Sequence, residues 1–258
     1  MKRLIYLFAT LAFIVVTMSS CLVEDNETYA EYNITRVASV TTNSDGKVLF
    51  VCDYTGEVFQ PDNVTDIASL ASFGVDASDH RVLAQIKIYQ TYTKTEVTLT
   101  GLSPIKVRTV DKKDMDTTVK YSAFTSFGRL QVDNGWAYPY GWVADGYLSV
   151  MPITNSVKEP ELILHPAGVN GDTLSFDLLG RFEYNASSQS STYCNYDLRT
   201  LTDTIGADSL SLRAMKAMCG AIHAHDSMIV VVNATCLYAD TVRSVIVPTG
   251  YFRCDWLK

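Results

Sequence analysis

The sequence lacks the short motifs that mark the common enzyme classes. It contains no Gly-x-Ser-x-Gly nucleophile elbow, no phosphate-binding loop, no dinucleotide fingerprint and no zinc-protease helix. Histidine is also scarce, with four residues in 258, and no Cys-x-x-Cys pair occurs. We therefore expect a protein that is not an enzyme and that carries neither a cofactor nor a metal.

Positive charge is in short supply as well. Lysine and arginine number 21 against 28 aspartate and glutamate residues, so the formal net charge is −7. Loss of Lys2 and Arg3 with an N-terminal signal makes the mature chain more negative still. Binding to nucleic acid or to anionic lipid headgroups normally needs a clustered basic surface. The composition therefore argues against nucleic acid as a partner, and any membrane attachment must depend on acyl chains.

The N-terminus carries an apolar run from Leu4 to Thr17 that is too short to cross the roughly 30 Å hydrocarbon core as a helix. Two basic residues precede this run, and small residues lead from it to Cys21. This order is typical of a bacterial lipoprotein signal peptide. We therefore predict that residues 1–20 are removed and that Cys21 carries lipid. The acyl chains anchor the protein to the membrane, at about 0.8 kcal/mol per buried methylene.

The segment after Cys21 is acidic and poor in apolar residues. It contains Glu24, Asp25 and Glu27, and its composition predicts a tether over residues 21–33. Acidic residues at this place resemble the surface-export signal of lipoproteins in Gram-negative anaerobes. The sequence thus favours an outer-membrane lipoprotein of the cell envelope that is displayed on the surface, over an anchor that faces the periplasm.

Residues 34–110 show short strands separated by turns. The apolar Val82, Ala84 and Ile86 occupy every second position, and the positions between and after them include Gln85 and Lys87. This alternation is typical of a strand with one face in the core. About five strands in this length predict a small β-barrel. Residues 111–118 are rich in charge and interrupt the strand pattern, so they are predicted to be a linker between two domains. Their spaced aspartates could also suggest a calcium-binding loop, but the glycine and the distal glutamate of such a loop are missing.

Residues 119–258 resume the strand pattern, with turn signals between several of the strands. One helix is predicted, from a cap at Asp208 or Ser209 to Gly220, because Met215 and Met218 lie among apolar residues at helical spacing. The predicted fold class is therefore all-β. An N-terminal barrel is followed by a C-terminal β-sandwich with a short helix.

Two short segments carry a family resemblance. The stretch 142–150, Trp-Val-Ala-Asp-Gly-Tyr-Leu-Ser-Val, and the stretch 196–201, Tyr-Asp-Leu-Arg-Thr-Leu, resemble the segments that open and continue the sandwich of NigD-like lipoproteins. The order of signal, acidic tether, barrel and sandwich is similar too, and covers nearly the whole chain. The resemblance implies an OB-type N-terminal barrel and no catalytic motif, and the family name implies an association with a bacteriocin.

Aromatic residues gather at alternate positions between residues 136 and 142. Trp136, Tyr138, Tyr140 and Trp142 would lie on one side of an extended chain and could stack on sugar rings or hold a peptide. Packing of the same rings in the core is the other interpretation, and Pro139 favours an edge or a loop over a central strand.

Two further patterns have a functional and a plain interpretation. His223 and His225 would share a face of a strand and could reach a metal, but the chain offers few further ligands, so a polar loop is favoured. A second pattern is a recurring tripeptide, in which Asp is followed by Ser or Thr and then by an apolar residue or threonine. This tripeptide resembles an O-glycosylation motif of exported bacterial proteins. The other interpretation is chance, because Asp, Ser and Thr also recur together at turns. The candidate acceptors are Thr117, Thr173, Thr204, Ser209, Ser227 and Thr241.

Five cysteines remain once Cys21 is assigned to lipid. Four of them lie in the C-terminal half, where a disulfide is one interpretation and small buried thiols are the other. An odd number leaves at least one thiol free or bonded to another chain.

Taken together, these features predict a lipid-anchored envelope protein that acts by binding or shielding, without catalysis. The alternative is a surface lipoprotein that binds a glycan or a peptide through residues 136–142. In both cases the partners are the membrane, through the lipid anchor, and a glycan, peptide or protein ligand.

Overall fold

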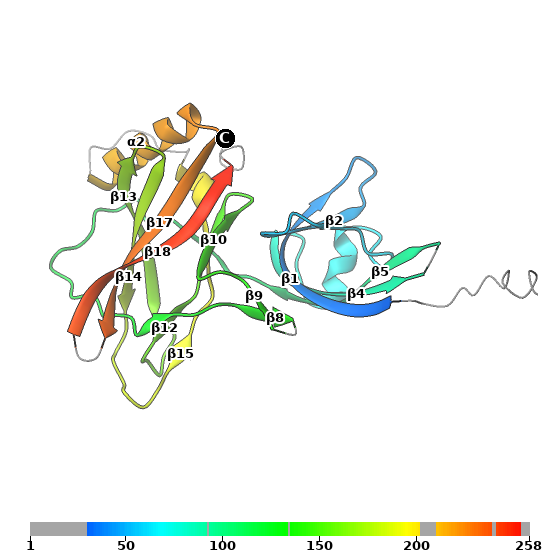
Figure 1. Cartoon of the computed structure of the whole chain (residues 1–258), viewed down its shortest axis with the longest axis horizontal. Helices are drawn as coiled ribbons and strands as arrows, with labels where there is room; N and C mark the ends of the chain where they lie inside the picture. Colours follow the sequence, from blue (N-terminus) through cyan, green and yellow to red (C-terminus); the bar gives the residue numbers. More distant parts are fainter. Residues whose placement is uncertain (1–29, 92, 134, 202–209, 239–240, 254–258) are drawn as a thin grey trace, which may run out of the picture.

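The computed structural model describes residues 30–91, 93–133, 135–201, 210–238 and 241–253. Strands dominate it, so the predicted all-β class is confirmed. Figure 1 shows two lobes side by side, with strands β1 to β5 in the N-terminal lobe and most of the later strands in the C-terminal lobe. Among the described residues, no helix is long and apolar enough to cross a bilayer. The predicted signal peptide and Cys21 lie outside the described residues.

The N-terminal lobe is built on one antiparallel sheet. In sheet order its strands are β3 (Val58–Phe59), β2 (Val48–Cys52), β1 (Ala30–Thr42), β4 (Arg81–Gln90) and β5 (Thr95–Pro104). Val82, Ala84 and Ile86 are fully buried, as their alternation predicted. The short helix η1 (Ile67–Phe73) adds Leu70 to the same core.

The two edges of this sheet are joined through the segment that follows β3. The Asp62 N–H donates to the Val97 carbonyl at 2.7 Å, and the Val97 N–H donates to the Asp62 carboxylate at 3.1 Å. The Asn63 side chain exchanges two hydrogen bonds of 2.9 Å with the Leu99 backbone. These bonds curve the sheet towards a barrel without a direct β3 to β5 ladder, and the OB-type assignment stays a prediction.

The C-terminal lobe packs several sheets around a second core. One sheet has the order β10, β11, β16, β6, and another has the order β13, β14, β17, β18. Leu148, Phe176 and Val232 are fully buried between them. The strands of the first sheet are β6 (Val107–Thr109), β10 (Gly141–Ala144), β11 (Tyr147–Val150) and β16 (Cys194–Asp197). Those of the second are β13 (Glu161–Asn170), β14 (Thr173–Arg181), β17 (Ser227–Tyr238) and β18 (Thr241–Arg253).

Smaller elements complete this lobe. A short sheet has the order β15, β12, β7, and β8 pairs with β9 in a hairpin that lies beside the N-terminal lobe (Figure 1). These strands are β7 (Ser126–Phe127), β8 (Gln131–Asp133), β9 (Trp136–Ala137), β12 (Pro152–Thr154) and β15 (Ser190–Ser191). The helices are η2 (Leu198–Leu201) and α2 (Leu210–Ala224), and α2 packs against β13.

Three predicted boundaries differ from the structure. β1 begins at Ala30, inside the predicted tether, because the backbone there pairs with β4 despite its polar sequence. β6 falls within the predicted barrel range of 34–110 but pairs in parallel with β16 of the C-terminal lobe. Helix α2 continues through Gly220, where the prediction ended it, because the fully buried Ile222 keeps the last turn packed.

Candidate functional site at the junction of the two lobes

The lobes meet in a small apolar core of their own. Val37 of β1 packs against Tyr138, Trp142 and Ala144, and all four side chains are buried. The Tyr138 and Trp142 rings stack with centroids 4.4 Å apart and planes 20° apart. The Tyr138 hydroxyl accepts a 3.0 Å hydrogen bond from the Val37 N–H, so a backbone donor of one lobe is satisfied by a side chain of the other.

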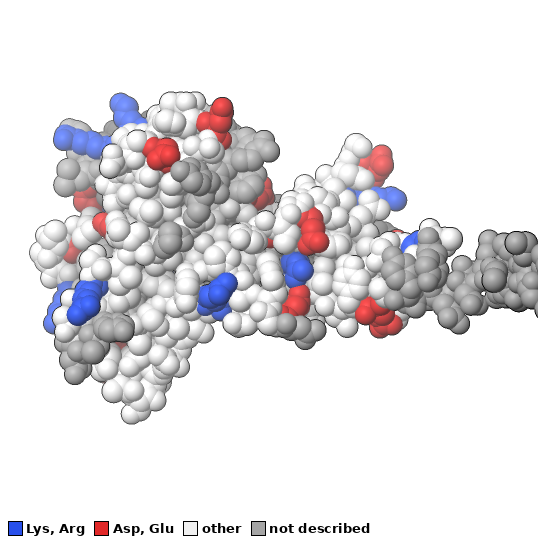
Figure 2. All heavy atoms as spheres, viewed as in Figure 1, with Lys and Arg blue, Asp and Glu red and all other residues white. Residues whose placement is uncertain are grey.

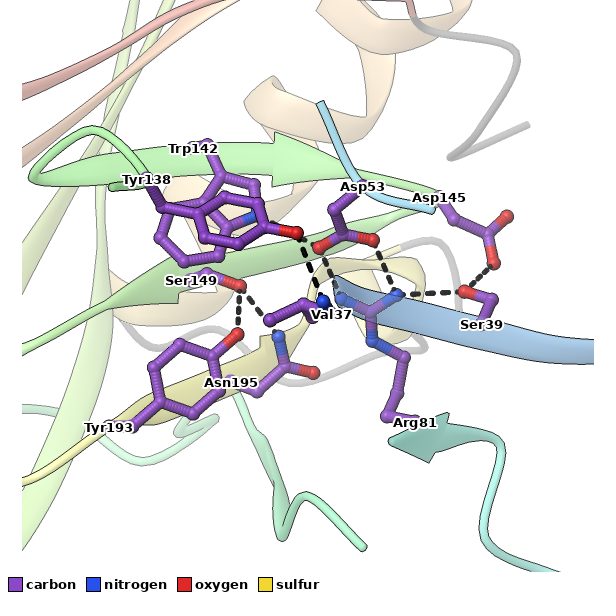
Figure 3. Close-up of polar contacts among 10 residues, drawn as sticks. All are labelled: Val37, Ser39, Asp53, Arg81, Tyr138, Trp142, Asp145, Ser149, Tyr193 and Asn195. Carbon is purple, nitrogen blue, oxygen red and sulfur yellow. Dashed lines mark hydrogen bonds and ion pairs between the residues drawn. The ribbon is translucent and has the colours of Figure 1, made fainter. Parts of the chain in front are cut away.

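A buried ion pair lies beside this core (Figure 3). The Arg81 guanidinium donates to both carboxylate oxygens of Asp53, at 2.8 and 2.6 Å, and both side chains are at most 1 % exposed. Trp142 of the C-terminal lobe completes the set with its indole Nε1–H, which donates to the same carboxylate at 2.8 Å. Removing one partner of such a pair leaves an uncompensated charge in the interior, which costs several kcal/mol.

The network continues to the β10–β11 hairpin. Arg81 also donates to the Ser39 hydroxyl at 2.8 Å, and Ser39 donates to the Asp145 carboxylate at 2.5 Å. Asp145 and Gly146 form the hairpin turn with φ values of 50° and 76°, which suits an Asp-Gly pair in a two-residue loop. Burial lowers the pKa of Arg81, but the charge and hydrogen bonds of Asp53 outweigh that effect and raise it, so the guanidinium stays charged.

Tyr147 lies between two arginines. The Arg81 guanidinium is 4.6 Å from its ring centroid and that of Arg199 is 4.3 Å away. Arg199 is held in place by a bidentate pair with Asp197 at 2.9 Å and also donates to the Tyr147 hydroxyl. Burial raises the pKa of Tyr147, so its hydroxyl stays protonated at neutral pH.

A second bridge joins β1 to the β8–β9 hairpin. The Asp133 carboxylate accepts from the Thr35 N–H at 2.7 Å and from the Arg36 guanidinium at 2.5 Å. The Arg36 guanidinium also lies over the Trp136 ring, 4.6 Å from its centroid. Together with the buried ion pair, this contact fixes the lobes at two separate points.

Two hollows open beside the junction. One measures about 330 Å³ and the other about 220 Å³, and Asp145 borders both. The larger is lined by Ser39, Val40, Thr41, Val51, His80, Asp145, Tyr147 and Arg199. Its polar groups are mostly engaged with one another, and within the described part of the chain no cluster of His, Cys, Asp or Glu could hold a metal ion. The arrangement joins the two lobes through side chains of both.

Comparison with solved structures places this fold among proteins of Bacteroides and Parabacteroides. An uncharacterised protein of Parabacteroides merdae matches with a TM-score of 0.52 at 12 % identity, over 85 % of this chain and 98 % of that one. A proposed lipoprotein of Bacteroides fragilis matches with a TM-score of 0.51 at 10 % identity, over 86 % and 98 %. The chain shares its fold with these proteins.

A NigD-like immunity protein of Bacteroides caccae is also among the structural matches, with a TM-score of 0.46 at 12 % identity over 85 % of this chain and 94 % of that one. The resemblance predicted from the sequence is confirmed as a likeness of fold by the two matches described above. No protein-family model and no curated protein sequence matches the chain.

The structure divides the four aromatic residues of the stretch 136–142. Tyr138 and Trp142 are buried at the junction, at 0 and 2 % exposure, so they pack in a core and present no open platform. Trp136 is half-buried beneath Arg36, and Tyr140 is 52 % exposed. The stretch is not one extended strand, because β9 ends at Ala137 and β10 begins at Gly141.

The candidate glycosylation sites differ in accessibility. Thr117, Ser227 and Thr241 are exposed, and Thr173 is half-exposed at the start of β14. Thr204 and Ser209 lie outside the described residues. Glycosylation of all these sites stays a prediction.

The histidine pair does not lie on a strand. His223 lies in the last turn of α2 and His225 follows the helix, so the two side chains do not share a strand face as the predicted metal site would need.

The described cysteines, Cys52, Cys194, Cys219 and Cys236, are free thiols. Burial raises the pKa of both Cys52 and Cys194 to about 12, so these two stay protonated and unreactive at neutral pH. Of the two interpretations of the cysteines, the described residues therefore fit small buried thiols, and no disulfide joins them. Cys254 lies outside them.

Sequence reasoning missed the two residues at the centre of the junction. Asp53 and Arg81 are separated by 28 positions and sit among other charged residues of the N-terminal lobe. The alternation gave no signal for Arg81, because its position places it on the strand face opposite Val82 and Ala84, which is the more polar face. Arg81 is buried there by contacts with the other lobe, such as the ring of Tyr147.

Proposed function

We propose that this protein is a lipid-anchored envelope protein that acts by binding or shielding at the cell surface, without catalysis. The observation that carries the proposal is the buried junction of Asp53, Arg81 and Trp142. Domains within one chain usually move relative to each other unless their interface is extensive and apolar. Here an aromatic core and the hydrogen bond from Trp142 to the buried Asp53 carboxylate join them, which supports a rigid body that holds the C-terminal lobe in one position.

The place of the N-terminus supports a role in display. β1 starts at Ala30 on the side of the N-terminal lobe that lies away from the C-terminal lobe (Figure 1). Residues 21–29, even if fully extended, reach at most about 30 Å, at roughly 3.3–3.6 Å per residue. A lipid on Cys21 therefore keeps the N-terminal lobe near the membrane and directs the C-terminal lobe away from it.

The C-terminal lobe is thus the part of the molecule available to a ligand or to the surroundings. Glycans on its exposed Ser227 and Thr241 would add to shielding by raising solubility and resistance to proteases. An association with bacteriocin production or immunity is proposed only on the family resemblance of the sequence.

Antibody labelling of intact cells tests the proposed display. An epitope placed between Ala186 and Ser187, in an exposed turn of the C-terminal lobe, should be labelled on intact cells as strongly as on cells with a permeabilised outer membrane. A tag that becomes accessible only after permeabilisation would show an anchor facing the periplasm and would contradict surface display.

A further inference from the structure

Strand β18 is an unpaired edge with exposed apolar side chains. Among the described residues it pairs with β17 alone, although β10 packs against it, and it lies last in the strand order of its sheet. Val242 and Ile246 are 60 and 62 % exposed, and Val245 is 36 % exposed. Natural proteins usually protect such an edge with charges, proline or a bulge. Pro248 and a register shift beside it lie further along β18, but between residues 241 and 247 no proline occurs and only Arg243 is charged.

The direction of the backbone groups on this edge follows from the neighbouring strand. On β17, the Leu237 N–H donates to the Phe124 carbonyl and the Thr235 carbonyl accepts from Phe124, so these odd-numbered residues bond away from β18. Backbone groups alternate in direction along a strand, so the even-numbered residues of β17 bond to β18. Their partners in the register are Arg243 and Val245.

It follows that Val242, Ser244 and Ile246 direct their N–H and C=O groups to the open edge. Residues 241–246 are all exposed, and alternation along the strand places these three side chains on the face opposite Val245 and Val247. Beside the edge lies an apolar groove of about 270 Å³, lined by Phe127, Tyr140, Val245, Ile246 and Val247, among others. Figure 2 shows the surface around β12 and β15 as uncharged, with basic side chains at the lower end of β18.

We propose that this edge binds a second copy of the chain by antiparallel β18 to β18 pairing around Ser244. In this register Ser244 faces Ser244 of the other copy, and Val242 faces Ile246. All of these residues have edge-directed backbone groups, so each pair exchanges two hydrogen bonds, about six in all. The facing Val242 and Ile246 side chains form cross-strand pairs of branched apolar residues, which favour strand pairing.

The charge of the molecule favours a second copy at this face over other faces. With a net charge of −7, two copies repel each other wherever their carboxylates meet. Residues 241–247 and the groove lining contain no aspartate or glutamate, so here the copies can approach without that repulsion. The pairing merges two four-stranded sheets into one continuous sheet and removes both open edges.

Oxidative cross-linking of the full chain in its membrane tests the proposal. Facing residues of a hydrogen-bonded antiparallel pair have Cα atoms about 5.5 Å apart, within the range of a disulfide. Under mild oxidation, Ser244→Cys should therefore give about ten times as much reducible dimer as the wild-type protein does. Thr235→Cys is the matched control, because it is exposed on the neighbouring strand but would lie three strand spacings, about 14 Å, from its copy.

A second substitution in the same assay separates pairing from random collision. Adding Ile246→Lys to Ser244→Cys should return the dimer to the wild-type level, whereas adding Val157→Lys, at a 71 % exposed apolar residue elsewhere, should not. Equal dimer from Ser244→Cys and Thr235→Cys would overturn the proposal, as would cross-linking of Ser244→Cys to a different polypeptide. The pairing does not depend on the lipid, so loss of surface display leaves this test intact.

Discussion

Replacing Arg81 by methionine is expected to lower the free energy of unfolding by about 3–5 kcal/mol. The guanidinium is fully buried and donates to both oxygens of Asp53 and to the Ser39 hydroxyl. Methionine fills much of the same volume but leaves the Asp53 carboxylate buried with Trp142 as its remaining side-chain donor. Denaturant titration of the purified variant, followed by circular dichroism, measures the loss as a lower midpoint.

Two further variants separate the buried pair from charge in general. Lys94→Met removes the cation of an exposed ion pair with Glu96 in the same lobe and should leave the midpoint close to wild type. Adding Asp53→Leu to Arg81→Met removes the unpaired charge and should recover part of the loss, although the Trp142 indole N–H then lacks its acceptor. If Arg81→Met is as stable as Lys94→Met, the junction does not stabilise the fold as described.

Cys21→Ser is expected to move the protein from the membrane fraction to the soluble fraction almost completely. Serine offers no thiol for lipid attachment, and the net charge of −7 gives the chain no electrostatic attraction to anionic lipid. The proposed anchor would then lose all its acyl chains at once, at about 0.8 kcal/mol per methylene. Ultracentrifugation of cell lysates, with detection of the protein in pellet and supernatant, measures the change.

Cys219→Ser is the control for this experiment, because Cys219 is a half-buried free thiol in α2 and its replacement should leave the protein in the membrane fraction. Globomycin, which blocks the lipoprotein signal peptidase, should in addition cause an unprocessed precursor to accumulate. A Cys21→Ser protein that still pellets with membranes would refute the lipid anchor.

The architecture could be predicted where a local pattern repeats. The alternation from Val82 to Ile88 is set by a strand with one buried face, and the structure buries Val82, Ala84, Ile86 and Ile88. The all-β class follows from many such short runs. The boundary between the two lobes was harder to predict from the sequence. β6 is a short strand, and only its pairing with β16 assigns it to the C-terminal lobe.

The junction could not be predicted because its parts are distant in sequence. Asp53 reads as one of many acidic residues, and only the tertiary structure brings it to Arg81 and to Trp142, which is 89 positions away. The aromatic pattern around Trp142 was visible, but a stacked pair such as Tyr138 and Trp142 serves a ligand platform and a core equally well. Burial against Val37 decides between the two, and it depends on the other lobe.

The rigidity of the junction is most directly tested by a distance measurement between spin labels in the two lobes. Labels at Lys47→Cys and Ser187→Cys, both exposed positions, are introduced after the accessible native cysteines have been replaced by serine. With Arg81 and Asp53 intact, pulsed electron resonance should give one narrow distance distribution, and Arg81→Met should broaden it. A broad distribution in the protein with the intact junction would contradict the account.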